Sequence, residues 1–125
     1  RRHPAIMAHL NALPAGSSIY MPVVAQAELL VGVETIPNGK RKSRLRELYE
    51  ESVATAADTI PIDSRVAERF AAISAQLRAD GTPISTNDIW IGAIALVANM
   101  TVASTDAHMG YIRGLRVENW TAQPA

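Results

Sequence analysis

The arrangement of apolar and polar positions along the chain predicts a succession of helices. Two stretches, 23–34 and 88–99, are apolar on nearly every side of a helix, so we expect both helices to be deeply buried. The stretch 64–79 carries apolar residues three or four positions apart, which indicates one buried face. A short helix is expected over 4–13, and the most polar helix over 40–57.

Short apolar segments between these helices predict strands. Polar residues suited to capping stand before two of the helices, and an Asp80-Gly81 pair ends one of them. Because strands alternate with helices, the pattern predicts an α/β domain with a mainly parallel sheet. The expected strands are 18–21, 60–62, 101–104 and 116–119, with one or two helical turns over 107–112 and with caps at Asp63 or Ser64 and at Ser85, Thr86 or Asn87.

Composition narrows the class of protein. The 125 residues fit one domain, and 48% hydrophobic with 19% charged residues allows a packed core. Lys plus Arg and Asp plus Glu both number 12, so any binding of nucleic acid needs a local basic patch. The absence of cysteine excludes disulfides, thiolate metal sites and a cysteine nucleophile. No apolar run approaches the roughly 20 residues that span a bilayer, and residues 1–4 do not resemble a signal peptide, so we expect a soluble cytoplasmic protein.

Three acidic residues lie within or at the end of apolar runs: Glu28, Asp88 and Asp106. An isolated ionised carboxylate is very costly to bury, so three of them suggest one pocket that holds a cation. Oxygen ligands without nearby histidine or cysteine favour Mg²⁺ or Mn²⁺, ions that bind phosphates and activate water. We therefore predict hydrolysis of a phosphodiester. Asp88 and Asp106 would ligate the ion, and Glu28 would ligate it directly or through water, or act as the base.

Each acid also has a purely structural interpretation. Glu28 could reach solvent or pair with an arginine, Asp88 could compensate the dipole of its helix, and Asp106 could cap the next short helix. The helix face that carries Asp88 continues through small residues, Gly92 among them, which would let another element come close. Asp106 follows a strand, which is where ligands bind in parallel sheets. Polar neighbours that could orient the acids are Asn87, Ser104 and Thr105.

The strongest basic cluster is 40–46. A solvated helix face paired with nearby glutamates explains this cluster, and contact with an RNA backbone is the alternative interpretation. His108 lies two residues after Asp106 and could contact substrate or simply be a surface residue. The candidate RNA contacts are Lys40, Arg41, Lys42 and Arg113.

Three segments resemble the PIN-domain ribonucleases, most closely the VapC-type toxins of bacterial toxin–antitoxin pairs. The segment 24–32 resembles the family's helix with a Glu-Leu-x-x-Gly core, and 87–95 resembles its helix with an Asp-x-x-Ile-(Ala/Gly)-Ala pattern. The segments 104–110 and 115–120 resemble the family's closing strand end, which has a (Thr/Ser)-x-Asp-like pattern, and its final strand. Order and spacing agree over nearly the whole chain.

The resemblance implies a three-layer α/β/α sandwich, a single PIN-like domain over 1–125, and a metal-dependent endoribonuclease in which Glu28, Asp88 and Asp106 match three of the family's acids. It also implies a homodimer whose active-site groove is entered by the tail of a small antitoxin. The family begins with an apolar strand that ends in Asp followed by Thr or Ser. Because this sequence starts at Arg1, near the first helix, we expect that strand and its acid to lie upstream of it.

Three other functions fit parts of the pattern. One is a PIN nuclease of RNA processing or DNA repair that has no antitoxin. Another is a catalytically silent PIN-like binding module, which the absence of the family's first acid favours. A phosphoacceptor receiver domain also gathers acids around a cation, but the sequence lacks the paired acids that follow its first strand.

Overall fold

The computed structural model describes residues 8, 9 and 11–121, which form two compact units. One unit is Ser18–Ile62, and the other comprises the described residues before it and those from Asp63 onward. A helix was predicted over 4–13. Within it, residues 8, 9, 11 and 12 are helical, and residues 4–7 and 10 lie outside the described residues. Among all the residues that the structure describes, no helix is long and apolar enough to cross a membrane.

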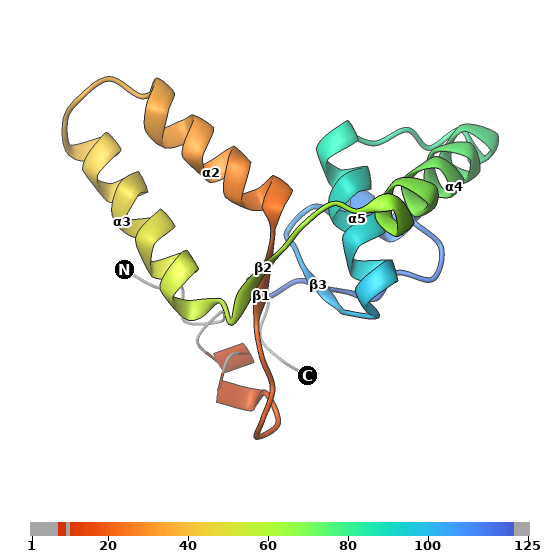
Figure 1. The fold of residues 1–125 in the computed structure, drawn as a ribbon, viewed down its shortest axis with the longest axis horizontal. Coiled ribbons are helices and arrows are strands. Elements are labelled where there is room, and N and C mark those ends of the chain that lie inside the picture. The colour runs from red at the N-terminus through yellow and green to blue at the C-terminus, as the bar shows by residue number, and fades with distance from the viewer. Residues whose placement is uncertain (1–7, 10, 122–125) are drawn as a thin grey trace. The chain divides into compact units, whose positions relative to one another are not determined.

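The smaller unit pairs two helices with two short parallel strands. Tyr20 lies opposite Asp58 in the strand pair, and the two helices run side by side (Figure 1). They approach closely at Gly32, where an added Cβ would lie 2.8 Å from Leu45 Cδ2. The elements of this unit are β1 (Tyr20–Pro22), α2 (Val23–Thr35), α3 (Lys40–Thr55) and β2 (Asp58–Ile60).

The expectation that the helix over 23–34 is deeply buried is wrong. Val33 is the single buried residue of α2, and the side chains of Leu30 and Val31 are 37% and 60% exposed. Within this unit α2 packs against α3 and the two strands, and α3 contributes no buried residue of its own. One helix and two three-residue strands cannot enclose every side of a helix, so an apolar face of α2 remains open.

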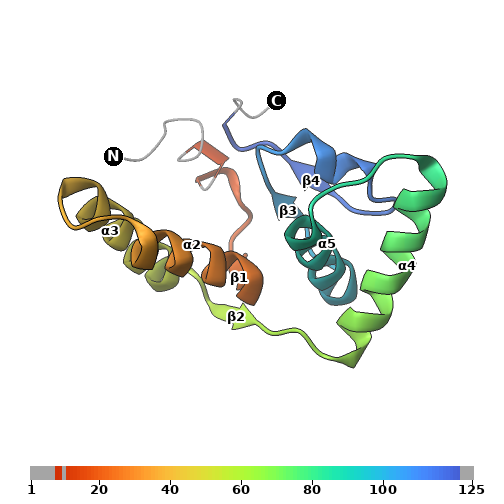
Figure 2. The ribbon, with the colours of Figure 1, turned by 90° about the horizontal axis from the view of Figure 1, so that it is seen from above.

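The larger unit places two packed helices beside a second pair of parallel strands (Figure 2). The predicted apolar stripe of the first helix is confirmed, because Val66, Ile73 and Leu77 are buried. Phe70 from the same stripe lies against Trp90, with 4.0 Å between ring centroids. The elements are α4 (Ser64–Asp80), α5 (Thr86–Ala98), β3 (Val102–Ala103), the 3₁₀ helix η1 (Ala107–Tyr111) and β4 (Val117–Glu118).

Polar side chains set the starts of both helices, as predicted. The Asp63 carboxylate accepts a hydrogen bond from the Val66 amide at 3.0 Å, and the Ser85 hydroxyl oxygen accepts one from the Asp88 amide at 3.2 Å. These bonds satisfy amides that have no partner within the helix. Gly81 ends α4 in the left-handed conformation, with φ of +69°. The predicted α/β class with parallel strands is confirmed, with the described strands arranged as two two-stranded sheets.

Candidate active site

Asp88 and Asp106 come together in the larger unit. Asp88 lies in the first turn of α5 and Asp106 is the N-cap of η1, and both residues are half-buried. Their carboxyl groups lie close enough to interact, and this interaction contributes to the lowered pKa of Asp106. Two of the three acids singled out in the sequence therefore share one location, even though each also occupies a structural position near a helix N-terminus.

Close packing between α5 and η1 brings these acids together. Gly92 lies four positions after Asp88, on the same face of α5. A Cβ added at Gly92 would lie 2.5 Å from Ile112 Cδ1 and 3.8 Å from Met109 Cε. Ile112 and Met109 are themselves buried, so they fill the space that the glycine leaves. The small residue thus permits the approach of η1, and η1 begins at Asp106.

Local donors hold the Asp106 carboxylate in place. Its Oδ1 accepts a hydrogen bond from the His108 amide at 2.9 Å and lies 3.1 Å from His108 Nδ1. The Asp106 amide donates to the Ser104 hydroxyl oxygen at 3.0 Å, so Ser104 orients Asp106 through the backbone. The pKa of Asp106 lies below its usual value, first because of the His108 amide and then because of the hydrogen bond from Asp88. Asp106 is therefore a fixed anion at neutral pH.

The chemistry of this pair suits a hard cation. Two ionised carboxyl groups side by side repel each other, and a cation between them relieves that repulsion. A divalent ion at this place would be ligated by Asp88 and Asp106, and oxygen-only ligands are those that Mg²⁺ and Mn²⁺ accept. Among residues 8, 9 and 11–121, no group of three or more histidine or acidic side chains is arranged to hold a metal ion.

The other predicted site residues lie in varied settings. Glu28 is exposed on α2, in the unit Ser18–Ile62, so its meeting with the two aspartates stays a prediction. Asn87 and Thr105 are exposed next to Asp88 and Asp106, respectively. Lys40, Arg41 and Lys42 occupy the first turn of α3, where Lys42 is half-buried and the other two are exposed.

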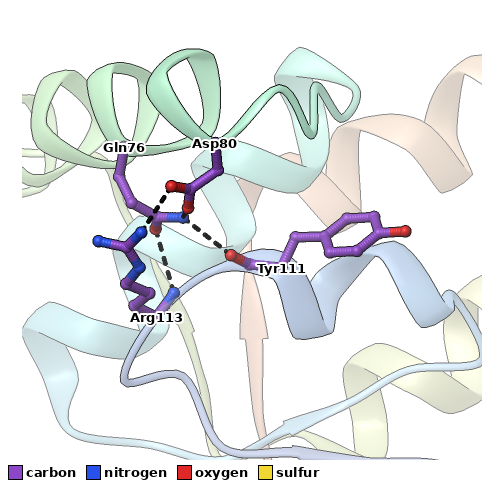
Figure 3. A network of polar contacts seen from close by, with 4 residues as sticks. All are labelled: Gln76, Asp80, Tyr111 and Arg113. Carbon is purple, nitrogen blue, oxygen red and sulfur yellow. Dashed lines mark hydrogen bonds and ion pairs between the residues drawn. The ribbon is translucent and has the colours of Figure 1, made fainter.

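Arg113 belongs to a polar network that the sequence did not reveal (Figure 3). Its guanidinium pairs with the Asp80 carboxylate at 2.5 Å, and its amide donates to Gln76 Oε1 at 3.1 Å. Gln76 Nε2 in turn donates to Asp80 at 2.7 Å and to the Tyr111 carbonyl at 3.0 Å. The spacing of Gln76 and Asp80 by four positions was the available signal, because such residues share a helix face. The network fastens the end of α4 to the end of η1.

Comparison with known proteins decides the family. A family model described as PIN domain matches residues 1–115. The chain belongs to the PIN domain family. This PIN domain is 34% identical to the plasmid stability protein StbB of Pseudomonas syringae pv. tomato, over 84% of this chain and 78% of StbB. It is also 34% identical to ribonuclease VapC5 of Mycobacterium tuberculosis, over 74% of this chain and 67% of VapC5.

A solved structure agrees with these matches. The PIN domain superposes with a TM-score of 0.67 and 32% identity on a member of the VapBC family of toxin–antitoxin systems, VapBC-5 from Mycobacterium tuberculosis. That match covers 78% of this chain and 76% of the other. The family resemblance drawn from the sequence is therefore confirmed. PIN ribonucleases imply a divalent cation in general, and the paired carboxyl groups of Asp88 and Asp106 fit one.

Proposed function

We propose that this PIN domain is the toxin of a toxin–antitoxin pair and cleaves RNA with Mg²⁺ or Mn²⁺ held at Asp88 and Asp106. The observation that carries the proposal is the meeting of the two carboxyl groups, which come from separate elements of the fold. The similarity to ribonuclease VapC5 and to the VapBC-5 toxin–antitoxin system supports it. A small antitoxin and a second copy of the chain are the proposed protein partners.

The residues of the chain have distinct parts in this reaction. A bound cation would offset charge on the scissile phosphate and lower the pKa of an attacking water. Asp88 and Asp106 would hold that cation, and the hydrogen bond from the His108 amide favours the ionised form of Asp106. Ser104 fixes the backbone of Asp106, which limits how far the carboxylate can move. Glu28 is proposed as a third acid, as ligand or as general base.

Variants that remove the negative charge of Asp88 or Asp106 but keep the helix cap test the role of the two acids in cleavage. Asparagine caps helices as well as aspartate does, so Asp106→Asn should leave η1 folded while it removes the negative charge. We expect Asp106→Asn and Asp88→Asn each to lower Mn²⁺-dependent cleavage of single-stranded RNA by about 100-fold or more. Asp63→Asn is the matched control, because Asp63 caps α4 in the same way but lies outside the pair. Cleavage by either pair variant at the rate of the control would refute the assignment.

A separate variant tests the third acid. Glu28→Gln should weaken the binding of Mn²⁺, measured by calorimetry, while the thermal midpoint stays unchanged, because Glu28 is exposed. Unchanged affinity for Mn²⁺ together with unchanged cleavage would remove Glu28 from the site. If the parent protein binds RNA but does not cleave it with either Mg²⁺ or Mn²⁺, the chain is a binding module rather than a nuclease.

A further inference from the structure

Two exposed aromatic side chains stand beside the acidic pair. The rings of His108 and Tyr111 lie nearly parallel, 25° apart, with 5.8 Å between their centroids, a separation usual for stacked aromatic pairs. Nevertheless both remain open to solvent, since the His108 side chain is 64% exposed and Tyr111 is 47% exposed. The two rings together therefore offer aromatic surface to a ligand.

The 3₁₀ geometry of η1 explains why both rings point outward. This helix has three residues per turn, so side chains three positions apart lie directly above one another. Met109 and Ile112 form one such pair and are buried against Gly92 of α5. His108 and Tyr111 form the next pair, which therefore lies on another side of η1. The packing that brings Asp106 to Asp88 thus also presents the two rings.

The position of both rings is fixed by other contacts. His108 Nδ1 is held 3.1 Å from Asp106 Oδ1, which leaves the faces of the imidazole uncovered by this contact. The Tyr111 carbonyl accepts a hydrogen bond from Gln76, and Arg113 anchors the chain two residues later. Figure 3 shows the phenol ring of Tyr111 pointing away from that network. These contacts hold the imidazole of His108 and the main chain of Tyr111 in place, and the two rings lie against each other.

We propose that His108 and Tyr111 form a stacking platform for an unpaired RNA base next to the phosphate cleaved at Asp88 and Asp106. The inference rests on the proposed ribonuclease function. Proteins that recognise single-stranded RNA stack its bases on histidine and tyrosine rings, and stacking accepts any base because every base has a π face. His108 contacts both Asp106 and Tyr111, so a base on the rings would belong to a nucleotide near the scissile bond.

Removal of the tyrosine ring gives the first test. With the full-length protein, Mn²⁺ and a single-stranded RNA oligonucleotide, we expect Tyr111→Ala to raise KM by roughly 5- to 100-fold, the range that loss of one stacked base produces, with a much smaller change in kcat. Tyr111→Phe retains the ring and should retain the parent KM. His108→Phe is the matched variant on the other ring: it keeps an aromatic face and the main-chain hydrogen bond to Asp106 and loses only the Nδ1 contact, so it should also retain the parent KM.

A modified RNA separates stacking from general effects on folding. In the parent protein, 2-aminopurine placed at the stacked position should lose fluorescence on binding, and an abasic nucleotide there should raise KM as much as Tyr111→Ala does. Combining the abasic RNA with Tyr111→Ala should cost nothing further, because the two changes remove the same contact. Effects of the two changes that multiply would overturn the platform.

The remaining outcomes are equally decisive. If the parent protein cleaves RNA and Tyr111→Ala has the parent KM, the platform is wrong while the proposed function stands. If Tyr111→Ala changes only the inhibition of cleavage by the antitoxin, the rings contact that protein instead of RNA, and the platform is again wrong. If the parent protein cleaves no RNA with Mg²⁺ or Mn²⁺, the proposed function fails and the platform fails with it.

Discussion

The contact between Gly92 and Ile112 permits a quantitative test of the packing that joins the two acids. A Cβ at Gly92 would lie 2.5 Å from Ile112 Cδ1, which is too close for both atoms to remain in place. Overpacking of a buried site costs about 1–3 kcal/mol, and replacing glycine by alanine in a helix returns about 1 kcal/mol. Gly92→Ala should therefore destabilise the fold by about 0–2 kcal/mol.

Ile112→Val removes the single atom with which that Cβ would collide. Alone, this change leaves a small cavity and costs about 1 kcal/mol. In the double variant the new Cβ occupies the space that Cδ1 has left, so overpacking and cavity both disappear. The sum of the single effects is a loss of about 1–3 kcal/mol, whereas we expect the double variant to be about as stable as the parent.

Urea unfolding followed by tryptophan fluorescence measures these differences, and Trp90 reports directly because it lies in α5. Additivity of the two single effects within about 0.5 kcal/mol would refute the reasoning. Cleavage of RNA supplies a second measurement. Displacement of η1 in Gly92→Ala should move Asp106 away from Asp88 and lower cleavage, and Ile112→Val should restore it.

Two further predictions concern the ends of α4. The pKa of Asp63 lies below its usual value, chiefly because its carboxylate accepts a hydrogen bond from the Val66 amide. The stability that this cap contributes is therefore present above about pH 4 and is lost as the pH falls through the lowered pKa. Thermal midpoints at pH 6 and pH 3 should therefore differ less for Asp63→Asn than for the parent, and equal differences would contradict the assignment. Gly81→Ala should lower the free energy of unfolding in urea by roughly 1 kcal/mol through backbone strain, because φ is +69° and an added Cβ meets nothing within 4 Å. Gly81→Asn should lower it less, because asparagine tolerates this conformation better than alanine. If Gly81→Ala is no more destabilising than Gly81→Asn, backbone strain is not the cause.

Local features of the fold could be predicted because their causes lie close together in the sequence. A cap and the amide that it satisfies are three positions apart, as for Asp63 and Val66. The apolar stripe of α4 repeats every three or four residues, so it identified Val66, Ile73 and Leu77 as buried residues. The starts and stops of the helices follow from the same short-range contacts.

Features that depend on contacts between residues far apart in the sequence could not be predicted from the sequence pattern. The apolar composition of α2 indicated burial, but burial depends on how much of the fold surrounds a helix, and Val31 is exposed. The approach of Asp106 to Asp88 depends on side chains of η1 that fit against a glycine in α5. Small residues near Asp88 hinted at this packing, while the outward direction of Tyr111 required knowledge that 107–111 is a 3₁₀ helix.

The composition of α3 has a consequence for how the protein opens. None of its 16 residues is buried, so detaching this helix exposes less apolar surface and costs less free energy than detaching α4 or α5. Its amide hydrogens should therefore exchange with solvent well before those of Gly92 to Ala95, which are enclosed in α5. Partial unfolding would begin at the polar helix and present it to proteases, while Asp88 and Asp106 stayed together.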